Sequence, residues 1–152
     1  ADQLIAMGCE VKIEDSSITL VGCDELRALK ADLNAIPDAA MTLVVLCSVA
    51  KGTSILTGLK NLAFKECDRL KALECELNKM GAKVLANEDG FLIEGVSLGS
   101  LKPAVIETYK DHRIAMCLSL LGSVVPETII RDPDCVEKTY PEYWKDLDLW
   151  LG

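Results

Sequence analysis

The spacing of apolar residues near the middle of the chain predicts an amphipathic helix. Leucines stand at positions 70, 73 and 77 and Met80 follows, so apolar side chains recur every three or four residues. Asp68 is a favoured N-cap residue in front of this pattern, and Gly81 stands where a C-cap glycine is favoured. We therefore expect a helix over residues 68–80.

A hairpin, a second helix and a strand are expected after it. Residues 83–85 and 90–94 favour strands, because the Asn-Glu-Asp-Gly sequence between them is typical of a turn. The second helix is expected from Asp111 to about Gly122, and a strand at residues 127–131, where Thr-Ile-Ile prefers extended backbone. The order is α-β-β-α-β, with room for a short edge strand near Val105 and Ile106.

The first half of the chain repeats the second at an offset of 73 residues. Residues 4–11 and 77–84 are identical at four of eight positions, Leu, Met, Gly and Val. The same offset aligns Asp38 with Asp111. Self-similarity at a fixed period indicates repeated architecture, which predicts an α+β fold made of two α-β-β-α-β units.

The two units are expected over about residues 1–66 and 67–152. In the first, the second helix is expected from Pro37 to about Ala50, since proline is well tolerated in the first turn of a helix. The first helix of this copy ends at Met7, far shorter than its counterpart in the second copy. This difference predicts that the chain begins inside a helix and is part of a longer protein.

Composition and charge narrow the class of partner. Half of the residues are hydrophobic, and 24 acidic against 16 basic residues give a formal net charge of −8. An acidic chain does not suit a nucleic-acid interface, although it can still hold a local cluster of cations for a small anion. No apolar run approaches the roughly 18 residues of a membrane span, and no secretory signal opens the chain. We expect no nucleic-acid and no membrane partner.

The cysteines indicate the compartment. There are seven, an odd number, without a Cys-x-x-Cys pair, and some lie in apolar runs, as at Cys47 and Cys117. This usage predicts reduced, mostly buried thiols in a cytoplasmic protein. One histidine and scattered cysteines give no zinc-ligand spacing, so no metal site is expected.

Three polar clusters, at residues 61–69, 109–113 and 137–139, stand out against the acidic background. Two lie at the starts of expected helices and the third leads into the last expected helix, at residues 143–150. Helix N-termini favour anions, and arginine and lysine side chains bind phosphate and carboxylate groups. A site for a phosphate or carboxylate is one interpretation of these clusters.

A purely structural interpretation also accounts for each residue. Lys-Glu-x-Asp-Arg at a helix start is typical of capping and salt bridges, a single histidine such as His112 is more often structural than catalytic, and Asp38 after a proline is more often a cap. No second histidine exists to pair with Cys67 as a nucleophile. The comparison of the two copies favours the interpretation as a binding or catalytic site. Asp38-Ala-Ala aligns with Asp111-His-Arg, so the copies share apolar positions but differ in their polar residues, which indicates one asymmetric site.

Four motifs follow one another along the chain. They are Asp-Leu-Asn-Ala-Ile-Pro-Asp-Ala-Ala-Met-Thr at 32–42, Lys-Glu-Cys-Asp-Arg at 65–69, Thr-Tyr-Lys-Asp-His-Arg-Ile-Ala-Met at 108–116 and Asp-Pro-Asp-Cys-Val-Glu-Lys-Thr-Tyr-Pro at 132–141. In this order they resemble the motifs of the 5-enolpyruvylshikimate-3-phosphate synthases, or 3-phosphoshikimate 1-carboxyvinyltransferases. They are spread across most of the chain, and together they are far more specific than any one of them.

The resemblance implies a transferase of the shikimate pathway, which leads to chorismate and the aromatic amino acids. The enolpyruvyl group of phosphoenolpyruvate would pass to the 5-hydroxyl of shikimate 3-phosphate by addition and elimination, releasing phosphate, with no metal or organic cofactor. The implied fold is the inside-out α/β, inverse-prism type, with helices packed inside and sheets turned partly to solvent. The implied parent protein is a monomer.

The resemblance also implies residue roles. Asp38 corresponds to a proton acceptor near the attacking hydroxyl, and Glu66 to a carboxylate that transfers a proton at the enol methylene carbon. The expected shikimate 3-phosphate contacts are Asp38, Asn61 and Lys65; the expected phosphoenolpyruvate contacts are Arg69, Arg113 and Lys138; His112 is expected to support the pocket.

The chain departs from the family pattern at Cys67, where threonine is common, and at Ile114, where methionine is common. We interpret both as packing changes, with Cys67 adding an oxidisable thiol beside the site. The family has two domains of three repeats each, and this chain corresponds to two of the six repeats, in the C-terminal domain. The resemblance therefore predicts that the N-terminal domain lies outside this chain and that the chain alone is inactive.

Two other functions remain open from the sequence. The sister enzyme that acts on UDP-N-acetylglucosamine shares the fold and the donor, although the pairing of the second and third motifs favours the shikimate branch. A non-catalytic repeat module that binds a partner through its sheets is the other alternative. An apolar face left uncovered by an absent domain would also favour weak self-association.

Overall fold

The structure, a computed structural model, describes all 152 residues and shows one order of elements twice. The first copy holds α1 (Asp2–Ala6), β1 (Glu10–Ile13), β2 (Ile18–Val21), β3 (Lys30–Asp32), α2 (Pro37–Ser48) and β4 (Thr53–Thr57). The second holds α3 (Arg69–Lys79), β5 (Lys83–Ala86), β6 (Phe91–Glu94), β7 (Val105–Ile106), α4 (His112–Gly122) and β8 (Ile129–Ile130). The expected order is present. Strand β7 is the short edge strand expected near Val105 and Ile106, and β3 in the first copy is an additional strand.

Short 3-10 helices and a terminal helix complete the chain. They are η1 (Lys60–Phe64), η2 (Leu98–Ser100), η3 (Pro133–Lys138) and α5 (Tyr143–Leu151). No helix is both long and apolar enough to cross a membrane.

The ends of α3 follow the expected capping chemistry. The Asp68 carboxylate accepts the backbone N–H of Lys71 at 3.2 Å and so satisfies one free donor of the first turn. Gly81, just past the helix, has φ +90°, and Gly8, its counterpart after α1, has φ +105°. Only glycine adopts such angles without strain, so the repeat conserves the stop signal of its first helix.

One sheet joins the two copies. Its strand order is β3-β4-β6-β5, in which β3 and β4 are parallel and the other two pairs are antiparallel. The last strand of the first copy therefore lies beside the hairpin of the second. The β1–β2 hairpin and the parallel β7–β8 pair each form a separate two-stranded sheet.

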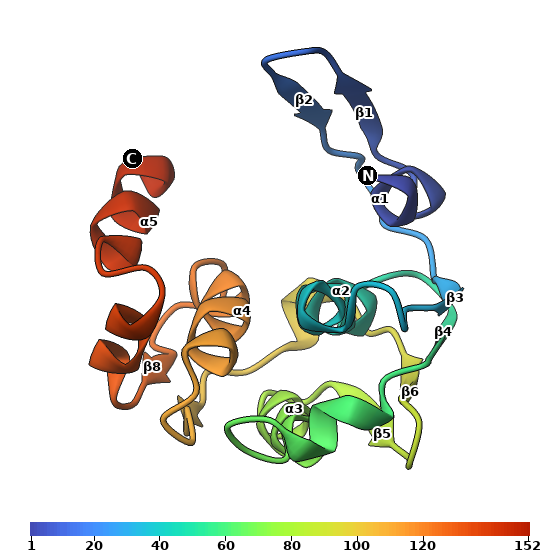
Figure 1. Ribbon diagram of the computed structural model, residues 1–152. Coiled ribbons are helices and arrows are strands. Elements are labelled where there is room, and N and C mark those ends of the chain that lie inside the picture. Colours follow the sequence, from blue (N-terminus) through green and yellow to red (C-terminus); the bar gives the residue numbers. More distant parts are fainter.

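The core lies among the helices and against the inner face of the four-stranded sheet. Helices α2, α3 and α4 contact one another, with α2 at the centre of the view in Figure 1. Seven of the 12 residues of α2 are buried, which explains its nearly continuous apolar sequence. The sheet leaves Ile55, Leu85 and Leu92 partly exposed on its outer face. Helices inside and sheets turned partly to solvent are the arrangement that the family resemblance implied.

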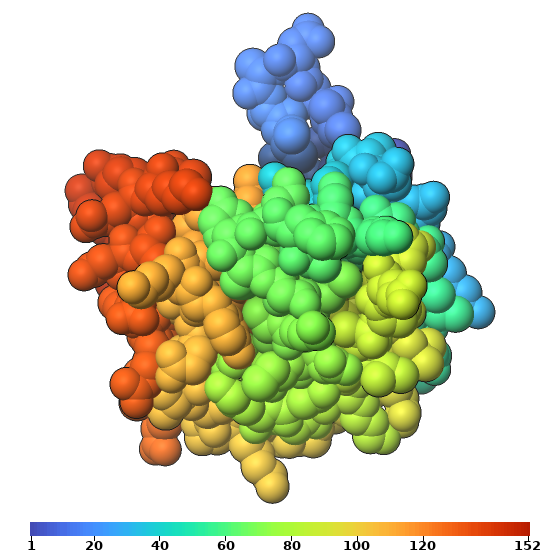
Figure 2. All heavy atoms as spheres, turned by 60° about the horizontal axis from the view of Figure 1, so that its bottom comes forward, coloured from blue at the N-terminus to red at the C-terminus, as the bar shows by residue number.

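The β1–β2 hairpin projects from this body. It rises at the top of Figure 1 and stands clear of the other elements in Figure 2. None of the residues of α1 is buried, whereas six residues of α3 are. The first helix and hairpin thus contribute little to the core, unlike their counterparts in the second copy.

Three expectations need correction. Strand β8 covers two residues rather than 127–131, because Glu127 has φ +69°, which is incompatible with extended backbone. Asp38 is the second residue of α2, whereas Asp111 is the N-cap of α4, so the two do not occupy the same helix position. The cysteines are all free, but only Cys47 and Cys117 are fully buried.

Candidate anion-binding site

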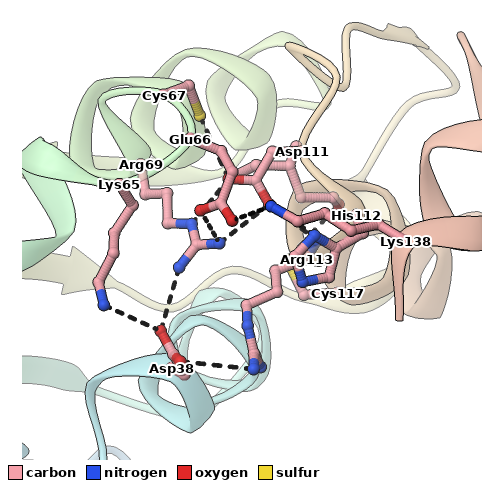
Figure 3. A network of polar contacts seen from close by, with 11 residues as sticks. Asp38, Lys65, Glu66, Cys67, Arg69, Asp111, His112, Arg113, Cys117 and Lys138 are labelled. Carbon is pink, nitrogen blue, oxygen red and sulfur yellow. Dashed lines mark hydrogen bonds and ion pairs between the residues drawn. The ribbon is translucent and has the colours of Figure 1, made fainter. Parts of the chain in front are cut away.

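Charged residues from several separate segments meet at one place (Figure 3). Asp38 comes from α2, Lys65 and Glu66 from the segment before α3, Arg69 from the first position of α3, Asp111 and Arg113 from the start of α4, and Lys138 from the end of η3. We call these seven residues the charged cluster. It contains all six charged residues that the family resemblance assigned to catalysis or binding, and Asp111 in addition.

Arg69 is the centre of the cluster. Its side chain is 2% exposed, and its guanidinium bonds to three carboxylates. Nε and Nη2 donate to the two oxygens of Asp111 at 2.7 and 3.1 Å. Nη2 also donates to Glu66 at 2.8 Å and Nη1 to Asp38 at 3.1 Å. A buried guanidinium at a helix N-terminus is unfavourable by itself, and these three carboxylates compensate it.

Asp38 faces three cations. Its Oδ1 lies 3.8 Å from the Lys65 ammonium and 3.1 Å from Arg69, and its Oδ2 lies 3.4 Å from Arg113. Figure 3 shows the carboxylate below the Lys65 and Arg69 side chains and beside the guanidinium of Arg113. Because the side chain is 42% exposed, water and small solutes can reach it. Asp38 is thus a partly solvated base among fixed positive charges.

Glu66 joins the cluster to the far end of the chain. It accepts from the Lys138 ammonium at 2.7 Å, although the two residues are 72 positions apart. The Lys138 hydrogen bond, together with the charge of Arg69, lowers the pKa of Glu66 from 4.5 to about 2. In this arrangement Glu66 is ionised at neutral pH, and it can hold a proton only when its counterions are engaged elsewhere.

Asp111 is the member of the charged cluster to which the family resemblance assigned no role. It is fully buried, and its carboxylate accepts the Arg113 backbone N–H at 2.9 Å as the N-cap of α4. Burial would raise its pKa, but the bonds from Arg69 and from that backbone N–H outweigh burial and lower it overall. The available signal was its place in Asp111-His112-Arg113, but an aspartate before a helix is ordinarily interpreted as a cap.

His112 and Asn61, which the family resemblance also assigned to the site, take no part in the ion pairs of the charged cluster. The His112 ring is almost fully buried, and burial lowers the pKa of His112, so the ring is neutral at physiological pH. Its Nδ1 lies 3.9 Å from Asp111 and makes no hydrogen bond. Asn61 is exposed on η1 and makes none of the contacts of the charged cluster.

A cavity of about 270 Å³ adjoins the cluster between α2, α4 and α5. Asp38 and Arg113 line it together with apolar side chains, among them Met116 and Trp150. A ligand at the cluster would therefore meet charge on one side and apolar surface on the other. The protein has no group of three or more His, Cys, Asp or Glu side chains placed to hold a metal ion.

The cluster suits anions. Four cations stand against three carboxylates and leave one net positive charge in a chain whose net charge is −8. Arg113 and Lys138 are 37% and 57% exposed, so both can bind a solute directly. Fixed cations beside two reachable carboxylates can stabilise a negative charge and move protons.

Comparisons with known proteins agree on one family. The sequence model described as EPSP synthase (3-phosphoshikimate 1-carboxyvinyltransferase) matches residues 1–147. The 3-phosphoshikimate 1-carboxyvinyltransferase of Colwellia psychrerythraea is 44% identical over 147 residues, which are 97% of this chain and 34% of that protein. The pentafunctional AROM polypeptide of Yarrowia lipolytica is 39% identical over 96% of this chain and 10% of its own length.

The fold comparison gives the same result. The structure of EPSP synthase from Acinetobacter baumannii has a TM-score of 0.86 and 27% identity, over 99% of this chain and 38% of that one. The chain thus spans about a third of the length of the curated 3-phosphoshikimate 1-carboxyvinyltransferases that it matches.

Proposed function

Because the chain belongs to the EPSP synthase (3-phosphoshikimate 1-carboxyvinyltransferase) family, we propose that it carries part of an active site that joins phosphoenolpyruvate to shikimate 3-phosphate. The observation behind this proposal is the charged cluster, in which Asp38 and Glu66 stand on either side of Arg69. Two bases among four cations are what the transfer of an enolpyruvyl group from a phosphate ester needs.

The cations would hold phosphoenolpyruvate. This donor carries a carboxylate and a phosphate, and Arg113 and Lys138 are exposed enough to meet both. Arg69 would join them only by exchanging a bond to Asp38 or Glu66, since most of its donors are engaged. Arginine gives bidentate geometry and lysine a mobile point charge, so the set fits two different anionic groups.

The carboxylates would move the protons. Asp38 would accept the proton of the 5-hydroxyl as the hydroxyl oxygen attacks C2 of phosphoenolpyruvate, while C3 takes up a proton from Glu66, which can hold one once the donor's anionic groups engage Arg69 and Lys138. Glu66 would then take a proton back from C3 as the bond between C2 and the bridging phosphate oxygen breaks. The leaving phosphate would take the proton held by Asp38, and the enolpyruvyl ether would form. Lys65 and Asn61 would contact shikimate 3-phosphate, with Asn61 moving toward the ligand, and His112 would support the pocket from beneath.

The balance of charge between the cluster and the two substrates favours a site that is completed by residues outside this chain. Two substrates with two anionic groups each exceed the single net positive charge of the cluster, so further cations are needed. We propose that this chain supplies two of the repeats of a C-terminal domain, residues 1–66 and 67–152, and that an N-terminal domain supplies the rest. On this basis the 152-residue chain alone binds phosphoenolpyruvate weakly and has no turnover. We further propose a monomeric, cytoplasmic parent protein, the latter because all seven thiols are free.

The test compares two arginine variants. Phosphoenolpyruvate is titrated into the chain by NMR, with Arg113→Ala as the site variant and Arg131→Ala as the matched control, because Arg131 is exposed and pairs only with Glu107, at 3.1 Å. We expect binding by the wild type and by the Arg131 variant, and loss of binding in a folded Arg113 variant. Equal binding by both variants would overturn the proposed role of the cluster and favour a non-catalytic module.

Substrate identity needs the longer parent protein. We expect phosphate release from phosphoenolpyruvate with shikimate 3-phosphate as acceptor and none with UDP-N-acetylglucosamine. The opposite pattern would assign the protein to the sister activity.

A further inference from the structure

The turn that leads into α4 is strained. Tyr109 and Lys110 are consecutive, and both are in the left-handed region, with φ +55° and +56°. Residues with bulky side chains seldom adopt this region, and two in a row are rarer still. Such backbone persists only where the surroundings hold it, and it gathers at functional sites. This turn immediately precedes Asp111, His112 and Arg113.

A carboxylate outside the charged cluster holds the turn. Glu76, on α3, is fully buried, and its Oε1 accepts the Tyr109 hydroxyl at 2.6 Å. Its Oε2 accepts the Glu107 backbone N–H at 3.0 Å and the Lys79 ammonium at 2.6 Å. A buried carboxylate with both oxygens bonded is a rigid anchor, because releasing the Tyr109 bond would leave one buried carboxylate oxygen without a donor.

The turn is thereby fastened to one face of α3 at two points. Glu76 and Arg69 are seven positions apart on that helix, which is close to two turns and puts both on the same side. Glu76 holds Tyr109, and Arg69 holds Asp111 two residues further along. The intervening backbone, including Lys110, has little freedom between these two contacts.

We propose that Glu76 and Tyr109 are positioning residues, whose contact holds the left-handed turn that sets where Asp111, and with it Arg113, stands in the anion-binding site. Glu76 makes no contact with the cluster itself, so it acts only through the turn. A turn needed for folding alone would be served better by glycine at positive φ. The predicted effect on anion binding rests on the proposed function, whereas the predicted effect on the contact between Arg69 and Asp111 is independent of that function.

The first test removes one hydroxyl. Tyr109→Phe deletes the bond to Glu76 and keeps the ring. Tyr140→Phe is the matched control, because the Tyr140 hydroxyl donates a similar bond, 2.7 Å long, to the Asp146 carboxylate, and neither of these residues belongs to the charged cluster. The geometric readout is hydrogen exchange of the Arg69 Nε–H by NMR, and the binding readout is a titration with inorganic phosphate.

We expect the Arg69 Nε–H to exchange at least about tenfold faster in Tyr109→Phe, in proportion to more frequent opening of the Asp111 contact. Phosphate binding should weaken several-fold, while Tyr140→Phe matches the wild type in both readouts. Unchanged exchange in Tyr109→Phe would overturn the proposal, whatever the binding result. Absence of phosphate binding by the wild type would instead count against the proposed function and leave the exchange test decisive.

A second variant separates positioning from stability. Lys110→Gly relieves the strained angle and leaves the hydrogen bonds of Glu76 intact, so the midpoint of thermal unfolding should stay the same or rise. If the strained turn serves to position Asp111, this variant should still show faster Arg69 exchange and weaker phosphate binding. A Lys110→Gly protein with wild-type exchange and wild-type affinity would overturn the proposal.

Discussion

The guanidinium of Arg69 and the carboxylate of Asp111 form a two-point contact in which both side chains are almost completely buried. Nε and Nη2 donate to Oδ2 and Oδ1 at 2.7 and 3.1 Å, and the residues are 42 positions apart. The contact ties the start of α3 to the start of α4. It also leaves only the outer nitrogens of Arg69 to bond Asp38 and Glu66, so the same pair organises the proposed catalytic carboxylates.

Removing the charge of Asp111 should therefore destabilise the protein strongly. In Asp111→Asn the buried guanidinium of Arg69 loses the negative charge that compensates its own. Breaking a buried ion pair in this way lowers the free energy of unfolding by about 3–5 kcal/mol. Urea unfolding measures this change in the free energy of unfolding. Glu94→Gln is the control, since it removes a carboxylate from an exposed pair with Lys83 and should cost less than about 1 kcal/mol. Equal costs for the two variants would contradict the structural role of the pair.

Neutralising Asp38 should have opposite effects on binding and on turnover. The Asp38 carboxylate forms ion pairs with Lys65, Arg69 and Arg113, and an incoming phosphate must compete with it for these cations. Asp38→Asn should therefore tighten binding of inorganic phosphate by about threefold to tenfold, which corresponds to roughly 1 kcal/mol for a half-exposed carboxylate. In the longer parent enzyme the same variant should lose turnover, because the proposed base is gone.

Calorimetric or NMR titration with phosphate checks the first part of this prediction. Glu25→Gln is the matched control, because it makes the same change of net charge at an ion pair with Lys51 outside the cluster. If Asp38→Asn binds phosphate no more tightly than Glu25→Gln, the carboxylate does not compete with the ligand.

Local patterns were sufficient to predict most of the fold. The caps and apolar spacing of α3, the hairpin of β5 and β6 and the helix after Asp111 are short-range features, and each is present. The left-handed turn at Tyr109 and Lys110 was not predictable, because neither residue type prefers that backbone. It exists because buried Glu76 holds it through a contact 33 positions away, which no local pattern encodes.

The sequence predicted most of the residues that belong to the charged cluster, but not which of them bond to one another. Family motifs pointed to Asp38, Glu66 and Lys138, and the structure brings them together across the two copies. The sequence alone gave no indication that Lys138 pairs with Glu66, because only the fold joins them. Asp111 received no role from the sequence because a capping aspartate is common, and only the structure shows that it is also buried against the guanidinium of Arg69.

Acid should destabilise the protein partly through Glu66. Its pKa is about 2 in the folded protein against an ordinary value of 4.5, so the unfolded chain binds more protons between these values. The stabilising contribution of Glu66 is therefore complete above about pH 4.5 and is lost as the pH falls toward about 2. The free energy of unfolding, measured in urea across this window, should fall less steeply in Glu66→Gln than in the wild type.

Part of the slope should remain in that variant, because Asp111 also has a lowered pKa and loses stability in the same direction. Glu88→Gln is the control, since this exposed side chain makes no ion pair or hydrogen bond, and its slope should match the wild type. A Glu66→Gln slope equal to that of the wild type would contradict the depressed pKa.

Cys67 should be less reactive than Cys75, the next thiol along the chain, despite its position between Glu66 and Arg69. Burial, followed by the charge and hydrogen bond of Asp111, raises the pKa of Cys67 to about 12, and its Sγ donates to Asp111 at 3.6 Å. Because the thiolate is the reactive form, alkylation should be slow. Cys75, on α3, is exposed.

Brief treatment with iodoacetamide near neutral pH, followed by mass spectrometry of the peptides, should therefore label Cys75 at least about tenfold faster than Cys67, since each unit of pKa changes the thiolate fraction about tenfold. In urea the two rates should converge, because unfolding removes both the burial and the Asp111 contact. Comparable labelling of the two residues in the folded protein would mean that Cys67 is an accessible thiol after all. Slow labelling in the folded protein that becomes fast in urea would agree with a thiol that is partly buried and bonded to Asp111.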